Sequence, residues 1–167
     1  LMAREVAFKH GILLTFLPKP LLAQGGSGVH VNFSLRGKDG QNAIQGGMDP
    51  SQLSPLTRGC IAGLMHHHRA LAGLAAPSVN SYERLKPASL SGFWQNWGID
   101  HRNVTVRVSA EQGPSSRLEQ RMGDGTANPY TLVAAVLQAA RLGVTGPLPL
   151  QPMETGDGLA SQDATVS

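Results

Sequence analysis

Three stretches of the chain alternate between apolar and polar residues, as β-strands with one buried face do. They span residues 29–35, 103–109 and 116–122. Two less regular apolar runs, at 93–98 and 12–17, predict further strands, and we expect the second of these to be buried. The polar sides of the alternating stretches carry His30, Arg107, Arg117, Glu119 and Arg121. The pattern therefore predicts a sheet with one apolar and one polar face.

Apolar residues at helical spacing predict two long helices and one short one. The first long helix begins at a cap formed by Asp49 and ends near Pro77. The second has Asn128 as its N-cap and ends at Gly143. The short helix covers residues 2–10.

Several residues that invite a functional interpretation have a simpler structural one. Consecutive histidines on a helix point about 100° apart, so the triplet at 66–68 cannot close on one metal ion. We expect His67, which falls on the apolar stripe, to pack or to lie at an interface, and the histidines beside it to be solvated. Cys60 is expected to be a small buried apolar residue. The turn at 25–28 is not a phosphate-binding Walker loop, because a strand follows it and no Lys-Ser/Thr pair does.

For two further pairs of residues, the sequence either leaves the role undecided or favours a structural role. Trp94 and Trp97 either line a pocket for a nucleotide or amine, or simply pack, and the sequence does not separate these alternatives. Asp124 and Asn128 are expected to be turn and cap residues rather than ligands.

The composition narrows the class of ligand. The chain has 167 residues, of which 41% are hydrophobic and 15% charged, enough for a domain with a core. Its net charge of +3 gives little reason to expect nucleic acid or a membrane as partner, and no apolar run approaches the ~20 residues of a membrane span. Arginine outnumbers lysine by 10 to 4, which favours a small anionic ligand. The single cysteine fits a reducing compartment, and we expect a cytoplasmic protein.

The polar sheet face suggests phosphoryl transfer. If the alternating strands share one antiparallel sheet, their polar residues line a common surface. His30 and Glu119 are suitable ligands for Mg²⁺ or Mn²⁺. Arginines beside them would neutralise phosphate oxygens, and charge stabilisation does most of the work in this chemistry. The alternative is a solvated face with alternating charges.

Six blocks, in order, then show that the sequence resembles the C-terminal half of the glutamine synthetase catalytic domain, from about residue 3 to residue 146. The blocks are TFLPKP, GGSGVHVNFSL, AGLMHHHRALAGLAAPSVNSYERLKP, WGIDHRNVTVRV, RLEQR and DGTANPYTLVAAVLQAARLG. The resemblance implies an α+β fold of that type, with an antiparallel sheet, a polar active-site face and helices packed on the other side. Residues 1–146 would be the C-terminal portion of the catalytic domain and residues 147–167 an irregular tail.

The resemblance also implies roles for individual residues. His30 and Glu119 would be two ligands of the metal that bridges the ATP phosphates. Gly26, Arg84 and Arg121 would bind the glutamate substrate. Arg102, Arg107 and Arg117 would face the phosphates of ATP and of γ-glutamyl phosphate, and Arg102 and Arg107 would be catalytic.

The activity implied is an ATP-dependent ligase that joins ammonia or a larger amine to the side-chain carboxylate of glutamate. It would work with Mg²⁺ or Mn²⁺ in a homo-oligomeric ring, such as a dodecamer, with active sites between subunits. Leu90 stands where glutamine synthetases carry a glutamate that binds ammonium, which favours a larger amine. Most of the family's metal-binding glutamates would precede Leu1, so we expect the chain alone to be inactive. The alternative is a non-catalytic relative with a role in assembly or regulation.

Overall fold

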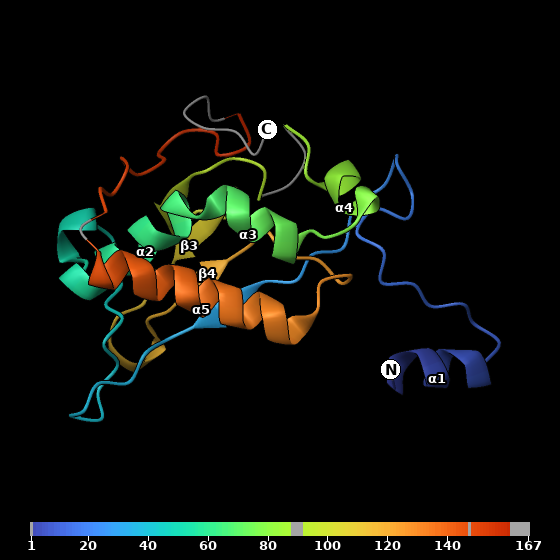
Figure 1. The fold of residues 1–167 in the computed structure, drawn as a ribbon, viewed down its shortest axis with the longest axis horizontal. Coiled ribbons are helices and arrows are strands. Elements are labelled where there is room, and N and C mark those ends of the chain that lie inside the picture. Colours follow the sequence, from blue (N-terminus) through green and yellow to red (C-terminus); the bar gives the residue numbers. More distant parts are fainter. Residues whose placement is uncertain (1, 88–91, 147, 161–167) are drawn as a thin grey trace.

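A layer of helices covers one face of a small sheet in the computed structural model, which describes residues 2–87, 92–146 and 148–160. Helix α1 (Met2–Lys9) buries none of its residues and projects away from this body, at the dark blue end of the chain (Figure 1). The α+β class is confirmed. In the described part of the chain, no helix is both long and apolar enough to cross a bilayer.

The sheet contains four strands of three residues each: β1 (Val31–Phe33), β2 (Trp97–Ile99), β3 (Val106–Val108) and β4 (Leu118–Gln120), in the order β1-β4-β3-β2. Strand β4 is antiparallel to both of its neighbours, as expected, but β2 and β3 are parallel. The sheet is therefore mixed rather than wholly antiparallel. After β2 the connection at residues 100–105, which begins at Asp100 with a φ of 48°, returns the chain so that β3 starts beside the start of β2.

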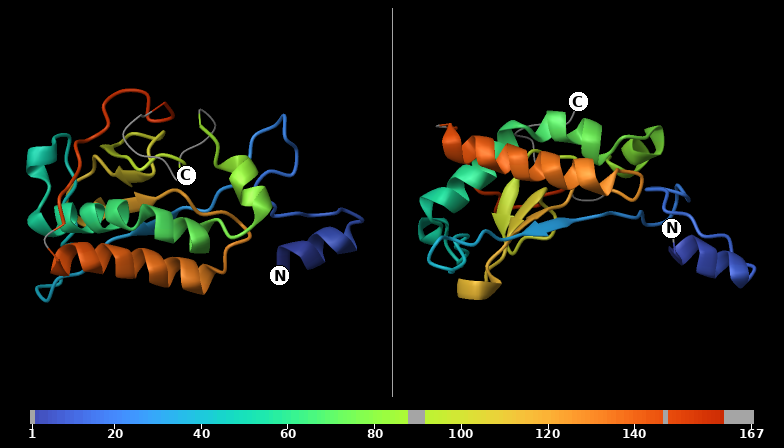
Figure 2. Two further views of the ribbon diagram at one scale, coloured as in Figure 1. Left: turned by 45° about the horizontal axis from the view of Figure 1, so that its top comes forward. Right: turned by 60° about the horizontal axis from the view of Figure 1, so that its bottom comes forward.

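The predicted alternation is confirmed in these strands. Val31, Val106, Val108 and Leu118 point into the core and are at most 9% exposed. The helices lie against this apolar side of the sheet (Figure 2). The polar residues that alternate with these apolar ones lie on the opposite face of the sheet.

The helix predicted from Asp49 to Pro77 is wrong as a single element. Asp49 caps only a short 3-10 helix, η1 (Pro50–Gln52), and Ser54 caps a new helix, α2 (Pro55–His66). A second break at His67, with φ −94° and ψ 13°, separates α2 from α3 (His68–Ala75). The break turns His68 into the core, where it is 1% exposed, so the expectation that His68 is solvated was wrong. His66 is exposed, as expected, and His67 is partly buried.

Helix α5 (Pro129–Thr145) begins as predicted, with the Asn128 side chain accepting the backbone N–H of Tyr130, but it extends two residues past Gly143. It packs against α2 at very short range. A Cβ on Gly63 would lie 2.1 Å from the carbonyl oxygen of Ala139, so only glycine fits there. The short helices α4 (Val79–Arg84) and η2 (Gly113–Ser115) complete the elements of the described residues.

Residues 12–17 do not form the buried strand that was expected. They are irregular, and the side chains of Ile12 and Leu13 are 61% and 97% exposed. The composition of the run favours burial, but its contacts are few: Arg4 lies over the ring of Phe16, and Gly125 lies beside the backbone of Phe16. Apolar composition alone therefore did not determine its place.

Residues 148–160, the described part of the predicted irregular tail, contain no helix or strand and run along the outer edge of β2. The backbone N–H of Glu154 donates to the carbonyl oxygen of Trp97 at 2.9 Å. The indole N–H groups of Trp94 and Trp97 donate to the carbonyl oxygens of Leu159 and Gln151. Both tryptophans therefore have a packing role in fixing this segment, which we call the C-terminal arm.

Candidate active site

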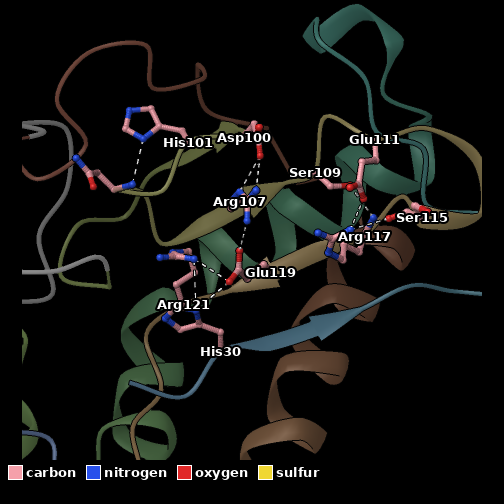
Figure 3. Close-up of polar contacts among 11 residues, drawn as sticks. His30, Asp100, His101, Arg107, Ser109, Glu111, Ser115, Arg117, Glu119 and Arg121 are labelled. Carbon is pink, nitrogen blue, oxygen red and sulfur yellow. Dashed lines mark hydrogen bonds and ion pairs between the residues drawn. The ribbon is translucent and has the colours of Figure 1, made fainter. Parts of the chain in front are cut away.

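Four of the predicted site residues meet on the polar face of the sheet: His30, Arg107, Glu119 and Arg121 (Figure 3). Arg107 and Glu119 are direct cross-strand neighbours in the pairing of β3 with β4. His30 immediately precedes β1, and Arg121 immediately follows β4. Antiparallel pairing of β1 with β4 brings these two ends together. We call these four residues the face cluster.

Glu119 is the centre of the face cluster. Its Oε1 lies 2.8 Å from His30 Nδ1 and 2.7 Å from Arg121 Nη1, and its Oε2 accepts from Arg107 Nη1 at 3.0 Å. The Glu119 side chain is only 10% exposed. A carboxylate this shielded from water needs such charge-assisted hydrogen bonds to remain ionised.

The surroundings keep both potential metal ligands in their binding forms. Burial alone would raise the pKa of Glu119, but the hydrogen bond from Arg107 and the charges of Arg121 and His30 outweigh it, and the pKa lies below its usual value. Burial and the charge of Arg121 lower the pKa of His30. At neutral pH the pair is therefore a carboxylate and a neutral imidazole, the forms that bind divalent cations.

The donor set fits part of a metal site. Glu119 uses three of its four lone-pair positions in the face cluster, so Oε2 keeps one. Nδ1 of His30 lies 2.8 Å from Glu119 Oε1 and 3.3 Å from Arg121 Nη1. The shorter contact, to an ionised carboxylate, favours the tautomer with its proton on Nδ1, in which the lone pair of Nε2 is the one that can bind a metal. Within residues 2–87, 92–146 and 148–160, no three His, Cys, Asp or Glu side chains form a group that could hold an ion. The face cluster thus supplies two ligands.

Arg107 lies between two carboxylates. Besides its bond to Glu119, it donates from Nε to Asp100 Oδ1 at 3.1 Å and from Nη2 to the same oxygen (Figure 3). Asp100 was not singled out in the sequence. Its position depends on the turn after β2, for which alternation gives no signal; its place in a polar turn between two strands was the available hint.

The other two arginines predicted for phosphate lie at the rim. Arg117 pairs with Glu111 and donates to the carbonyl oxygen of Ser115 at 3.0 Å, farther along β4 from the face cluster. Arg102 is exposed on the turn between β2 and β3. The charges of both arginines contribute to the lowered pKa of Asp100, so they lie within electrostatic reach of it.

Arg84 and Gly26, both expected to bind glutamate, lie in direct contact with each other. Arg84 is 2% exposed, and its Nη1 donates to the carbonyl oxygen of Met122 at 2.8 Å. A Cβ on Gly26 would lie 3.2 Å from Arg84 Cγ and 2.7 Å from the carbonyl oxygen of Pro18. The glycine loop thus packs directly on Arg84, and in this arrangement the missing Cβ makes room for the arginine.

Asp124 has the turn role that was predicted and a second one that the sequence did not show. Its Oδ1 accepts the backbone N–H and the hydroxyl of Thr126. Asp124 is 1% exposed, and its charge partly offsets the effect of burial, which lowers the pKa of Arg84. The proximity of Asp124 to Arg84 depends on the tertiary fold, so the sequence alone does not predict it.

Helices on the apolar side of a sheet and a His–Glu–Arg cluster on its polar side are what the sequence resemblance implied, although the sheet itself is mixed and not antiparallel throughout. The model of the family described as "Glutamine synthetase, catalytic domain" matches residues 1–166, and the chain belongs to this family. The match includes the C-terminal arm.

Similar proteins carry the same family name. The chain is 38% identical over 144 residues to a glutamine synthetase of Clostridium saccharobutylicum, and this match covers 86% of the chain and 32% of the relative. It is 39% identical over 143 residues to one of Pyrococcus furiosus, with 86% and 32% covered. For one of Thermotoga maritima the identity is 36% over 155 residues, with 92% and 35% covered. The chain thus spans about a third of the length of these relatives.

Proposed function

We propose that the protein to which this chain belongs is an ATP-dependent ligase that joins ammonia or a larger amine to the side-chain carboxylate of glutamate through γ-glutamyl phosphate. The observation that carries the proposal is the face cluster, in which two metal-ligand side chains and two guanidiniums share one sheet face in a chain of the glutamine synthetase family. A charged sheet face that is merely exposed to solvent would not require a carboxylate such as Glu119, which is shielded from water and held by three partners.

The residues divide between the two parts of the reaction. His30 and Glu119 would hold Mg²⁺ or Mn²⁺, which supplies positive charge to the phosphates of ATP. Arg107, with Arg102 and Arg117 at the rim, would stabilise the charge that develops on the transferred phosphoryl group. Arg121, Arg84 and Gly26 would position glutamate, with Arg84 acting from beneath the glycine loop.

The assembly and setting belong to the same proposal. The remaining metal ligands would come from parts of the protein outside this chain, and active sites would lie between the subunits of a homo-oligomeric ring. We place the enzyme in the cytoplasm, where the thiol of Cys60 would stay reduced. Burial raises the pKa of the Cys60 thiol to about 11, so the thiol stays protonated at neutral pH and is unreactive.

The acceptor amine depends on the segment that contains Leu90, which lies outside the described residues. Leucine has no group that attracts ammonium or takes its proton, so we propose an amine larger than ammonia. An apolar side chain there would offer contact to the carbon chain of such an amine.

A single assay tests the activity. The full-length protein is incubated with ATP, glutamate and Mg²⁺ or Mn²⁺, and phosphate release is measured with ammonium, alkylamines, polyamines and aromatic amines. Glutamate-dependent release with at least one amine is expected. If no amine supports release, the ligase is excluded and a non-catalytic relative is the better description; if ammonium serves as well as every other amine, the argument from Leu90 fails.

A further inference from the structure

Asp100 occupies the part of Arg107 that is best suited to hold a phosphate. Two nitrogens of one guanidinium edge, Nε and Nη2, both donate to Asp100 Oδ1. Two parallel donors on one edge are the fork with which arginine binds carboxylates and phosphates alike. With Nη1 on Glu119, each nitrogen of Arg107 already has an anionic partner.

Asp100 faces more positive charge than this one partner. Hydrogen bonds from Arg107 hold the pKa of its carboxyl below the usual value, and the charges of Arg107, Arg102 and Arg117 act in the same direction, against a smaller effect of burial. The carboxylate is thus ionised at neutral pH. It lies among the three arginines that we propose for the phosphates.

The two carboxylates on Arg107 differ in how firmly they are held. Glu119 is 10% exposed and has three partners. The Asp100 side chain is 53% exposed, and Arg107 is its one side-chain partner among the described residues. An exposed ion pair contributes little, whereas breaking a shielded one leaves a buried charge without its partner. An incoming anion would therefore displace Asp100 and leave Glu119 in place.

We propose that Asp100 is an internal competitor of the substrate phosphates: it holds the Nε/Nη2 edge of Arg107 in the free protein and yields it to a phosphate oxygen. Asp100 thereby keeps Arg107 oriented before binding and weakens the affinity of the site for ATP. The inference rests on the proposed function, because the phosphate is taken to be that of ATP.

The variant Asp100→Asn tests this inference. Asparagine has the same shape and tolerates the positive φ of residue 100, so the turn is preserved. Binding of ATP with Mg²⁺, and separately of inorganic tripolyphosphate, is measured by titration calorimetry on the full-length protein. We expect the Kd for both anions to fall about two- to five-fold, the range that the loss of an exposed competing ion pair allows.

Two controls separate this mechanism from a general change in charge. Asp39→Asn also removes one negative charge, on the exposed loop where Asp39 accepts the backbone N–H of Gln41, and should leave both constants unchanged. In an Arg107→Gln background, Asp100→Asn should no longer tighten binding. A gain that persists in that background overturns the inference.

The remaining outcomes are also decisive. Unchanged or weaker anion binding in Asp100→Asn would show that Asp100 only supports Arg107, and the competitor role would be wrong. Tighter tripolyphosphate binding without any ATP binding to the wild-type protein would keep the inference and count against the proposed function. Failure of both anions to bind either form overturns both.

Discussion

At the scale of single residues, Glu119 determines how the polar face is organised. One carboxylate orients His30, Arg107 and Arg121, which come from three different places in the sequence. Alternation predicts that these side chains share a face, because successive residues of a strand point to opposite sides. It does not predict Asp100, since that residue reaches Arg107 only through a turn with positive φ.

Replacing Glu119 with glutamine should disable the site. The amide cannot accept three charge-assisted hydrogen bonds, so Arg107 and Arg121 lose their common anchor and the proposed metal site loses one of its two ligands. If the proposed function holds, ligase activity of the full-length protein should fall at least about 100-fold and Mn²⁺ affinity at least about tenfold. Phosphate release and Mn²⁺ titration measure the two effects. Glu83→Gln, which changes a carboxylate paired with Lys86 on the surface, should retain both.

His68 should make the stability of the fold depend on pH. Burial lowers the pKa of His68 from 6.5 to about 4, against a smaller opposing effect of its hydrogen bond to the carbonyl oxygen of Phe93. As the pH falls below 6.5, His68 becomes protonated in the unfolded chain, whereas in the folded chain it is protonated only near pH 4. The free energy of unfolding should therefore fall by about 3 kcal/mol across this window.

Urea unfolding at several pH values, followed by tryptophan fluorescence, measures this dependence. In His68→Gln the amide still donates to Phe93 but does not titrate, so the slope between pH 6.5 and 4 should become shallower. The exposed control His10→Gln should keep the wild-type slope. An equal slope in His68→Gln would mean that other groups cause the acid sensitivity.

At the scale of elements, the sequence predicts where a capped helix begins better than it predicts whether a helix is continuous. Asn128 and Pro129 begin α5 where the capping rule places them, because the Asn side chain satisfies backbone N–H groups of the first turn. The break at His67 was missed, since the apolar stripe continues on both sides of it. Once the backbone departs from helical geometry there, the next histidine takes the buried place.

The contact between α2 and α5 offers a test with an internal control. Gly63→Ala would place a Cβ 2.1 Å from the Ala139 carbonyl oxygen and 2.8 Å from the backbone nitrogen of Gly143, so the helices must separate. We expect a loss of about 2–4 kcal/mol in the free energy of unfolding. Gly73→Ala in α3 meets nothing within 4 Å and should be neutral or stabilise by up to about 1 kcal/mol, through helix propensity. Similar urea midpoints for both variants would contradict this view of the packing.

At the scale of the whole molecule, long-range contacts decide what local pattern cannot. The C-terminal arm has no periodicity, yet it covers the edge of β2 through backbone groups that any sequence possesses. Residues 12–17 have the composition of a buried strand but remain exposed. Burial is a property of what packs against a segment, and that information lies elsewhere in the chain.

Asn96 links the arm to the sheet, and its loss should loosen both. Its buried side chain accepts the backbone N–H of Thr105 at 3.0 Å and donates to the carbonyl oxygen of Gly158 at 2.8 Å. Asn96→Ala leaves two partner groups without these bonds, which should cost about 2–4 kcal/mol and speed proteolysis of the arm. Limited proteolysis with mass spectrometry and urea unfolding measure these effects. Asn103→Ala, at an exposed position in the turn between β2 and β3, should behave like the wild type.

Strand β1 ends the sheet on the side away from β4, and no other strand of the described residues pairs with it there. An edge strand offers a row of backbone donors and acceptors to any extended segment of another chain or domain. A fifth strand paired with the free edge of β1 would widen the sheet through backbone hydrogen bonds alone. The side chains of the four existing strands would not have to change. His30, now at the margin of the sheet, would then lie in the middle of a wider platform.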